Sequence, residues 1–330
     1  MQNINEDEKN AALENKIDKS WLDKRVIFVL GKGGVGKTTI SMAMGVAASH
    51  HKKKILLVEV GMADNIGHIF CGRTLAENIE MIHKENQSEI WGVRINPRAV
   101  IEDYIHVNVG INFISNRITR SKLFDHLSEA TPGLKEVMTL GQIWRWEQMK
   151  DEKGNPFFDM IIVDAPATGH GVSLLRIPQA LIEMIKVGPI VEQTKVVQNL
   201  FRDQSQTWVV AVTLPEELPV NETIELQAIA ENELKMPVKA IFINGIYPKI
   251  FTEEDIKEIQ NLHQNSSNMS KQEKILLESA MRKITRRNLQ HDYADLIKKK
   301  SKCDVIEIPF FYTNELSLKQ IEEITYKSIM

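Results

Sequence analysis

Residues 31–38 combine glycines, a lysine and a threonine at the spacing G-x-x-x-x-G-K-[ST]. In this pattern the backbone N–H groups of the loop surround a phosphate chain, the lysine meets the β- and γ-phosphates, and the hydroxyl binds Mg²⁺. Lys37 and Thr38 fill the last two positions. We therefore expect both side chains to contact a bound nucleoside triphosphate.

The elements on either side of this loop support that interpretation. An apolar run of β type, Val26 to Leu30, precedes the loop, and a run rich in alanine, methionine and valine follows it. The helix predicted to begin near Lys37 adds its positive end to the anion site. The alternative, a chance glycine-rich turn, is disfavoured by the strand before the loop and the helix after it.

Glycine is expected to be required at Gly33, Gly34 and Gly36, because the loop must take positive φ and let the backbone approach phosphate. The nucleotide contacts predicted in this loop are Gly33, Gly34, Val35, Gly36, Lys37, Thr38 and Thr39.

A second apolar run, Phe157 to Val163, ends in Asp164. A buried strand of this kind delivers a carboxylate to the metal side of a phosphate site. Asp164 is therefore predicted to hold Mg²⁺ together with Thr38. The competing interpretation is a structural aspartate at the end of a strand.

Size and composition limit the class of protein. The chain has 330 residues, 43% of them hydrophobic, and a net charge of −3, so it can bury a large core and has no general attraction for nucleic acid. Cys71 and Cys303 are its only cysteines, which gives no C-x-x-C metal pair and suits a reducing cytosol. No apolar run approaches the roughly 18 residues of a membrane span, and no signal-peptide core is evident. We expect a cytoplasmic protein.

Further short apolar runs predict the other strands, at 54–60, 91–97, 208–213, 238–243 and 304–308. Strand, helix and strand in succession form a βαβ unit with the phosphate site at the carboxyl end of the sheet. The predicted fold is α/β, a mostly parallel central sheet with helices on both faces. Residues 1–24 are predicted as a loosely docked polar extension, and residues 25–330 as a single domain with a helical subdomain around 120–205.

Lys32, directly after the first glycine, completes the sequence K-G-G-x-G-K-T, a deviant Walker A pattern. This resembles the signature-lysine class of P-loop ATPases, which includes the ParA and MinD types, nitrogenase iron protein, arsenite-pump ATPases and tail-anchored-protein targeting ATPases. In that class the lysine crosses a dimer interface to the partner's nucleotide, so the resemblance implies ATP, Mg²⁺ and a dimer. The alternative is that Lys32 only adds charge within its own loop.

The segment from Asp164 to His170, D-A-P-A-T-G-H, resembles the switch II element D-T-A-P-T-G-H of the arsenite-pump and targeting ATPases. Two weaker similarities to the same family occur at 94–104, where Asn96 stands in place of an aspartate, and at 130–136. The resemblance covers most of residues 25–315.

The same family carries a switch I aspartate that polarises the attacking water, and an ungapped alignment places Gly61 at that position. Glycine can neither accept a proton nor orient water. Asp64 or Glu59 could substitute, although each is displaced from the expected place. ATP hydrolysis is therefore in doubt while ATP binding is not. An ordinary βα connection is the other interpretation of this loop.

In the relatives an asparagine at the end of a strand hydrogen-bonds adenine, and Asn244 matches that position. An amide suits the adenine edge because it both donates and accepts, although an asparagine that opens a turn has the same pattern. Pro309, Phe310 and Phe311 match the loop that closes over the base in the relatives.

Two features of the targeting ATPases are missing from the sequence: the long Met-rich helical insertion after switch II and the C-x-x-C zinc clasp. Delivery of tail-anchored proteins and metalloid export are both poorly supported. An apolar stripe on the predicted helices of 121–150 (Leu134, Val137, Met138, Gly141, Trp144 and Gln148) is expected to be core or dimer surface, or else to cradle a client helix. The basic segment at 282–287 and 298–300 is most simply a solvated face, with nucleic acid as a minor option.

Three functions follow from these observations. The leading hypothesis is a dimeric switch that ATP closes and ADP loosens, with slow or partner-dependent hydrolysis and an unknown protein client. The second is a non-hydrolysing ATP-binding subunit paired with an active paralogue, so that the dimer is a heterodimer. The weakest is a ParA- or MinD-like positioning protein, which the slight acidity disfavours.

Overall fold

The computed structural model describes residues 17–61, 65–85, 88–96, 99–100, 133–166, 173–185, 189–266, 269–313 and 316–330. The strands are β1 (Val26–Leu30), β2 (Lys54–Val60), β3 (Glu80–Glu85), β4 (Ser88–Ile95), β5 (Met160–Asp164), β6 (Thr207–Thr213), β7 (Val238–Ile246) and β8 (Asp304–Pro309). The helices are α2 (Lys37–His50), α3 (Asn65–Cys71), α6 (Leu134–Glu147), α7 (Ser173–Ile185), α8 (Pro189–Arg202), α9 (Glu217–Ile229), α10 (Glu253–Gln264), α11 (Lys271–Lys300) and α12 (Leu318–Ile324), with the short turns η1 (Lys19–Asp23), η3 (Ala230–Leu234) and η5 (Thr325–Ile329).

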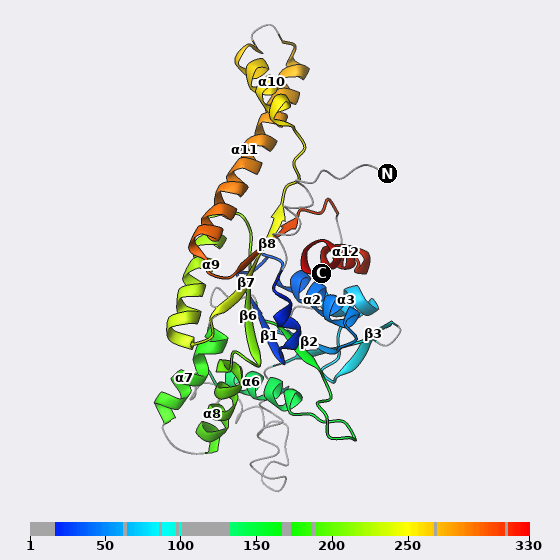
Figure 1. Ribbon diagram of the computed structural model, residues 1–330, viewed down its shortest axis with the longest axis vertical. Coiled ribbons are helices and arrows are strands. Elements are labelled where there is room, and N and C mark those ends of the chain that lie inside the picture. The colour runs from blue at the N-terminus through cyan, green and yellow to red at the C-terminus, as the bar shows by residue number, and fades with distance from the viewer. Residues whose placement is uncertain are drawn as a thin grey trace, which may run out of the picture.

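The described strands form one sheet in the order β3-β4-β2-β5-β1-β6-β7-β8 (Figure 1). Every neighbouring pair is parallel except β3 with β4, which is antiparallel. This confirms the predicted fold class. β1 lies between β5 and β6, and Val29 of β1 pairs with Asp164 of β5. The loop after β1 and the carboxylate at the end of β5 therefore start from adjacent strands at the same edge of the sheet.

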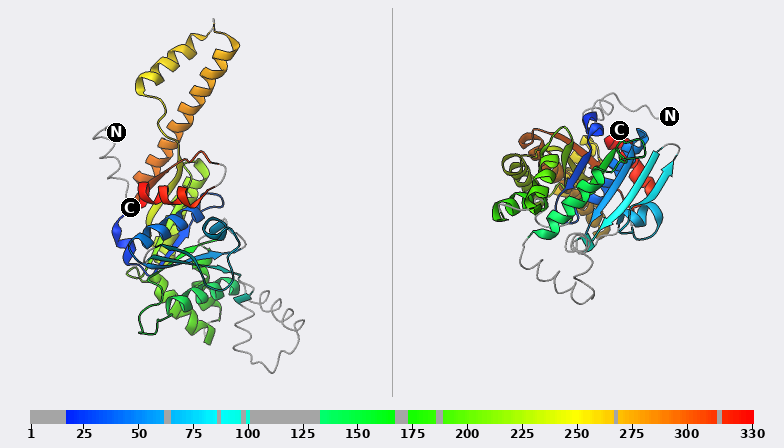
Figure 2. Two further views of the ribbon diagram at one scale, coloured as in Figure 1. Left: turned by 90° about the vertical axis from the view of Figure 1, so that its right-hand side faces the viewer. Right: turned by 90° about the horizontal axis from the view of Figure 1, so that it is seen from below.

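Helices cover both faces of the sheet (Figure 2). Alternate residues of each central strand are therefore buried in two separate cores, one on each face. Val26, Phe28 and Leu30 of β1 pack with apolar residues of α6, α8, α9 and the end of α11. Ile27 and Val29 pack on the other face with residues of α2 and α12.

The strand predictions differ from the structure at the polar ends and edges. β5 begins at Met160 rather than Phe157, and the predicted strand 91–97 is β4, which runs from Ser88 to Ile95. β3 was not predicted, because its sequence EMIHKE has one fully buried side chain and forms the antiparallel edge of the sheet.

The apolar face of α6 packs in the core, which was one of the predicted alternatives for this helix. Its buried side chains include Val137, Leu140, Ile143 and Trp146. Gln148, the last member of the predicted stripe, is exposed, so that position was wrong. The helix ends at Glu147, just before it.

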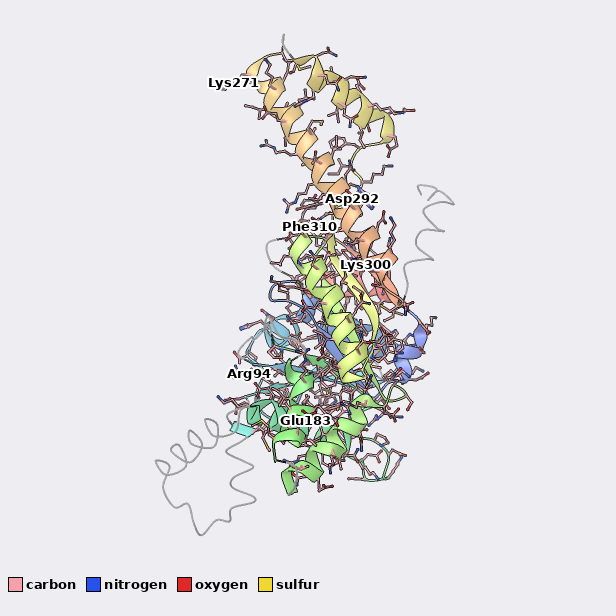
Figure 3. All side chains as sticks on the ribbon, turned by 90° about the vertical axis from the view of Figure 1, so that its left-hand side faces the viewer. Arg94, Glu183, Lys271, Asp292, Lys300 and Phe310 are labelled. Atoms are coloured by element: carbon pink, nitrogen blue, oxygen red, sulfur yellow. The ribbon has the colours of Figure 1, made fainter. Side chains whose placement is uncertain are left out.

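The helices α10 and α11 form a hairpin that projects from the sheet-containing body (Figures 1 and 3). Lys271 lies at its far end and Lys300 against the body (Figure 3). Capping boxes at Thr252 and Ser270 fix where the two helices begin. In the described part of the chain, no helix has both the length and the apolar character needed to cross a bilayer.

Residues 17–24 lie in the folded body, although the sequence analysis assigned them to a loosely docked extension; residues 1–16 lie outside the described ranges. Trp21 is 2% exposed and Ile17 is 3% exposed, and both belong to the core on the α2 face. Asp18 caps η1 and its N–H donates to Asp304 at 2.8 Å. Trp21 and Ile17 anchor this otherwise polar segment.

Replacement of Trp21 by alanine should lower the free energy of unfolding by about 3–5 kcal/mol, because it leaves a cavity under η1. Urea denaturation followed by circular dichroism measures the loss. The matched control is Leu218→Ala, whose side chain is 59% exposed and which should change stability by less than about 0.5 kcal/mol. Equal effects of the two substitutions would contradict the docked segment.

Candidate nucleotide-binding site

A cleft of about 760 Å³ opens where the carboxyl ends of β1, β2 and β5 meet. Six of the predicted site residues line it, namely Gly34, Gly36, Lys37, Thr38, Thr39 and Asp164. Its other walls include Met42, Val60, Asn65, His68 and Ile69, which the sequence analysis did not single out. No sequence pattern pointed to them, because they are ordinary helix and strand-end residues. The cleft size is typical of a small-molecule site.

The glycine loop owes its shape to two close backbone approaches. Positive φ occurs at Gly31, Gly34 and Gly36 and not at Gly33, so the expected positive φ was wrong for Gly33, while its approach to phosphate stays a prediction. A Cβ at Gly31 would lie 2.3 Å from the carbonyl oxygen of Val212 in β6. A Cβ at Gly36 would lie 2.2 Å from Nδ2 of Asn244. Glycine is required at these two positions by crowding as well as by φ.

Asn244 holds the loop from behind. Its Nδ2 donates to the carbonyl oxygen of Val35 at 2.9 Å, and the residue does not line the cleft. Pro309 and Phe310 lie near the same end of β7, where the N–H of Phe310 donates to Ile246 at 2.8 Å. The ring of Phe310 packs on Tyr247 with a centroid separation of 4.9 Å. Contact of these three residues with adenine stays a prediction.

Lys37 lies at the start of α2 and is 6% exposed. Its Nζ donates to the carbonyl oxygen of Lys32 at 2.9 Å. Burial lowers the pKa of Lys37, and the nearby charge of Asp164 opposes that shift. The ammonium group is therefore held inside the loop, where a phosphate would replace the carbonyl oxygen as its partner.

Thr38 and Asp164 form the polar centre of the cleft. Oγ1 of Thr38 donates to Oδ2 of Asp164 at 2.6 Å. Burial raises the pKa of Asp164 to about 6, against the opposing effects of the Thr38 hydrogen bond and the Lys37 charge. Oδ1 of Asp164 is buried and has no hydrogen-bond partner within the described residues. A threonine hydroxyl beside an unpaired carboxylate oxygen fits a hard cation such as Mg²⁺.

Gly61 and Glu59 are two described residues of the region predicted as switch I that bear on the orientation of water. Gly61 has φ of +113°, and the nearest atom to an added Cβ would be in Pro166 at 4.0 Å. Glu59 is 1% exposed and accepts the N–H of Asn65 at 3.0 Å, at the start of α3. Asp64 lies outside the described residues, as do residues 167–170 of the switch II pattern.

Lys32 forms an ion pair with Glu222 of α9, with Nζ and Oε1 2.8 Å apart. The two side chains are 32% and 39% exposed. Glu222 is separated from Lys32 by 190 residues in the sequence. The sequence analysis assigned it no role, because only the fold brings it to the loop.

The comparison with known proteins shows the family. The sequence model of the anion-transporting ATPase family matches residues 24–189, half of the chain. ATPase BagA of Mycobacterium tuberculosis is 29% identical over 234 residues, which cover 70% of this chain and 68% of BagA. ATPase GET3 of Lachancea thermotolerans is 25% identical over 279 residues, which cover 74% of this chain and 78% of GET3. ATPase GET3B of Arabidopsis thaliana is 23% identical over 272 residues, which cover 68% of this chain and 65% of GET3B.

The raised pKa of Asp164 predicts a pH-dependent loss of stability. The folded chain binds this proton more tightly than the unfolded chain, so the stabilisation is complete below the ordinary pKa of 3.8 and is lost as pH rises through about 6. Between about pH 5 and pH 7 the wild type should lose about 1 kcal/mol relative to Asp164→Asn, whose amide oxygen still accepts from Thr38. Urea titrations with chelator and without nucleotide measure this; parallel pH curves for both proteins would contradict it.

Proposed function

The chain belongs to the anion-transporting ATPase family, and from this premise we propose that it binds ATP with Mg²⁺ in the P-loop cleft and acts as a dimeric, nucleotide-dependent switch. The observation that carries the proposal is the convergence of Lys37, Thr38 and Asp164 around a glycine loop at the edge of a parallel sheet.

The binding chemistry follows from the groups in place. Backbone N–H groups of the loop and the N-terminus of α2 attract the phosphates, and Lys37 exchanges the Lys32 carbonyl oxygen for a phosphate oxygen. Thr38 and Asp164 would hold Mg²⁺, which supplies positive charge to the phosphate oxygens when bound. Burial of Lys37 and Asp164 keeps water away and strengthens these interactions.

Replacement of Lys37 by alanine should weaken ATP binding by about 100-fold, since a hydrogen bond to a charged group contributes up to about 3 kcal/mol. Isothermal titration calorimetry with Mg²⁺ and ATP measures it. Lys271→Ala, which removes an equal charge at the far end of the hairpin, is the control and should bind ATP as the wild type does. Undiminished binding by Lys37→Ala would overturn the assignment of the cleft.

The dimer is proposed on Lys32. In the single chain this lysine is paired with Glu222 and remains one-third exposed, so it is available to a facing copy. An exposed ion pair contributes about 0.2–1 kcal/mol, little enough for the phosphates of a second subunit to displace it. The Lys32–Glu222 pair would then be the resting state of the switch, and nucleotide would shift Lys32 from one partner to the other.

Replacement of Lys32 by alanine should abolish the ATP-dependent increase in mass while leaving ATP affinity within about threefold of the wild type, since Lys32 does not line its own cleft. Sedimentation velocity with and without ATP measures the mass. Glu222→Gln releases Lys32 and should promote the dimer by up to about fivefold. A wild-type monomer at every ATP concentration would reject the dimeric switch.

A second candidate is favoured by Gly61, whose position carries no side chain to orient water. In this alternative the chain is a non-hydrolysing ATP-binding subunit that requires an active paralogue. The two candidates differ in the turnover of the isolated chain: rapid ATP hydrolysis by the pure protein removes the second candidate, and stoichiometric binding with negligible turnover supports it.

A further inference from the structure

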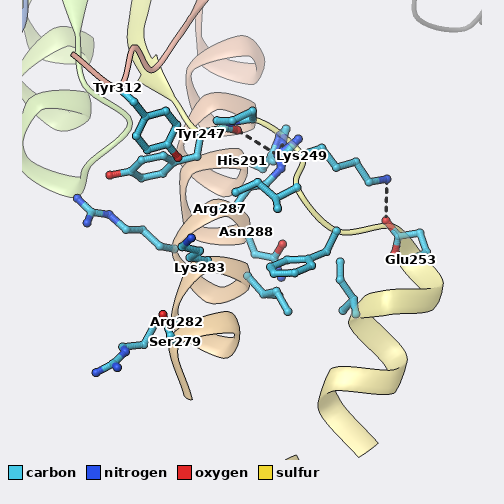
Figure 4. A pocket seen from close by; sticks show the side chains of 16 residues that line it. Tyr247, Lys249, Glu253, Ser279, Arg282, Lys283, Arg287, Asn288, His291 and Tyr312 are labelled. Carbon is cyan, nitrogen blue, oxygen red and sulfur yellow. Dashed lines mark hydrogen bonds and ion pairs between the residues drawn. The ribbon is translucent and has the colours of Figure 1, made fainter. Parts of the chain in front are cut away.

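A second cavity, of about 580 Å³, lies at the base of the α10–α11 hairpin (Figure 4). Its walls come from the segment after β7, the middle of α11 and Tyr312, and it shares no lining residue with the P-loop cleft. The basic segment 282–287, which the sequence predicted as a solvated face, forms part of its wall. Two of its lining side chains, Tyr312 and Ile250, are 69% and 51% exposed, so the cavity is open to solvent.

One side of this cavity is apolar and aromatic. Tyr247, Phe251, Ile256 and Ile284 line it, and Tyr312 stands at its edge with 69% of its surface exposed. The rings of Tyr247 and Tyr312, both drawn in Figure 4, each pack on Phe310, with centroid separations of 4.9 and 5.0 Å. Side chains of this kind offer pockets for apolar and aromatic groups of a ligand.

The rest of the lining is strongly basic. Arg282, Lys283, Arg286 and Arg287 of α11 contribute to it, while Glu253 is the one carboxylate and is paired with Lys249 at 3.1 Å. Arg286 lies over the ring of Tyr247 at 5.1 Å. Within the described residues, Arg282 and Lys283 have no ion-pair partner. The cavity thus has an uncompensated positive charge next to apolar walls.

Exposed apolar side chains continue from the cavity along α11. Ile275 is 53% exposed, Leu276 71% and Leu289 50%. Ile275, Arg282 and Leu289 recur every seven residues, so they lie along one face of the helix. A face that alternates apolar and cationic side chains is unusual on a solvated helix, where such apolar residues occur singly.

The cavity wall is fixed to the body rather than loose. Gln290 of α11 is 7% exposed, accepts the N–H of Tyr247 at 2.9 Å and donates to the carbonyl oxygen of Gly245 at 3.1 Å. Arg287 donates to the carbonyl oxygen of Tyr247 at 3.4 Å. The site is therefore preorganised, which lowers the entropic cost of binding.

We propose that this cavity and the adjoining face of α11 bind a segment of a partner protein in which acidic side chains alternate with apolar or aromatic ones. The carboxylates meet Arg282, Lys283 and Arg286, and the apolar groups enter the cavity and cover Ile275, Leu276 and Leu289. A nucleic acid backbone would pair with the cations but would leave Ile275, Leu276 and Leu289 uncovered, whereas the apolar groups of a peptide cover them. The inference stands apart from the proposed function, because it needs no nucleotide.

The test uses the full chain without nucleotide and a fluorescein-labelled peptide that repeats glutamate, leucine, glutamate and phenylalanine, with binding followed by fluorescence anisotropy. The double variant Arg282→Glu/Arg286→Glu should bind at least about tenfold more weakly, since each exposed charge contact contributes up to about a factor of five. The matched control Lys257→Glu/Lys271→Glu makes the same charge change on the same hairpin outside the cavity and should bind within about threefold of the wild type. Circular dichroism checks that both variants fold.

Three results would overturn the proposal: no peptide binding by the wild type, equal weakening by the two double variants, or equally tight binding of polyglutamate or of a DNA duplex. A fourth is self-association that Arg282→Glu/Arg286→Glu abolishes, which would make the face an interface between copies. Failure of ATP binding would overturn the proposed function and leave this result untouched.

Discussion

The hydrogen bond from Thr38 to Asp164 joins the two halves of the site, the glycine loop with α2 and the end of β5. Its formation depends on the order of the strands in the sheet. The loop after β1 and the end of β5 meet because β5 lies between β2 and β1 in the sheet, so that β1 and β5 are adjacent parallel strands. Both residues are then held by buried strands and by α2, so neither has to be ordered when a nucleotide binds. The cost is a desolvated carboxylate, which is why burial raises the pKa of Asp164 to about 6.

The end of β7 connects this site to the hairpin. Asn244 holds the glycine loop through the carbonyl oxygen of Val35, and the next residues, Gly245 and Tyr247, are held by Gln290 of α11. A movement of the loop that breaks the Asn244 contact would therefore act on the same short segment that anchors α11. The end of β7 is thus a shared anchor of the glycine loop and of the hairpin base, where the second cavity lies.

Local sequence patterns predicted what depends on local structure. The glycine loop, the buried strands and the aspartate at the end of β5 could be predicted because each has a characteristic run of residues, and parallel strands bring their carboxyl ends to one edge. The pairing of Lys32 with Glu222 could not, because it depends on where α9 packs. Trp21 was missed because one aromatic residue in a polar segment has no periodic pattern, and β3 because a half-exposed edge strand needs few apolar residues. The cavity at the hairpin was missed because charges that look solvated along one helix gain a second wall only when the segment after β7 folds against them.

Binding and hydrolysis draw on different parts of this site. Binding needs backbone N–H groups, Lys37 and the Thr38–Asp164 pair, all of which the sheet holds in place. Hydrolysis also needs a group that orients water. Within the described residues, Oδ2 of Asp164 accepts from Thr38, its Oδ1 is the oxygen proposed to hold Mg²⁺, and Glu59 accepts the N–H of Asn65. Gly61 adds none. Because the two activities depend on separate residues, a substitution that removes the water-orienting group can leave nucleotide affinity intact. In the dimer proposed above, the exposed, weakly paired Lys32 is the residue of this chain that would reach the second subunit.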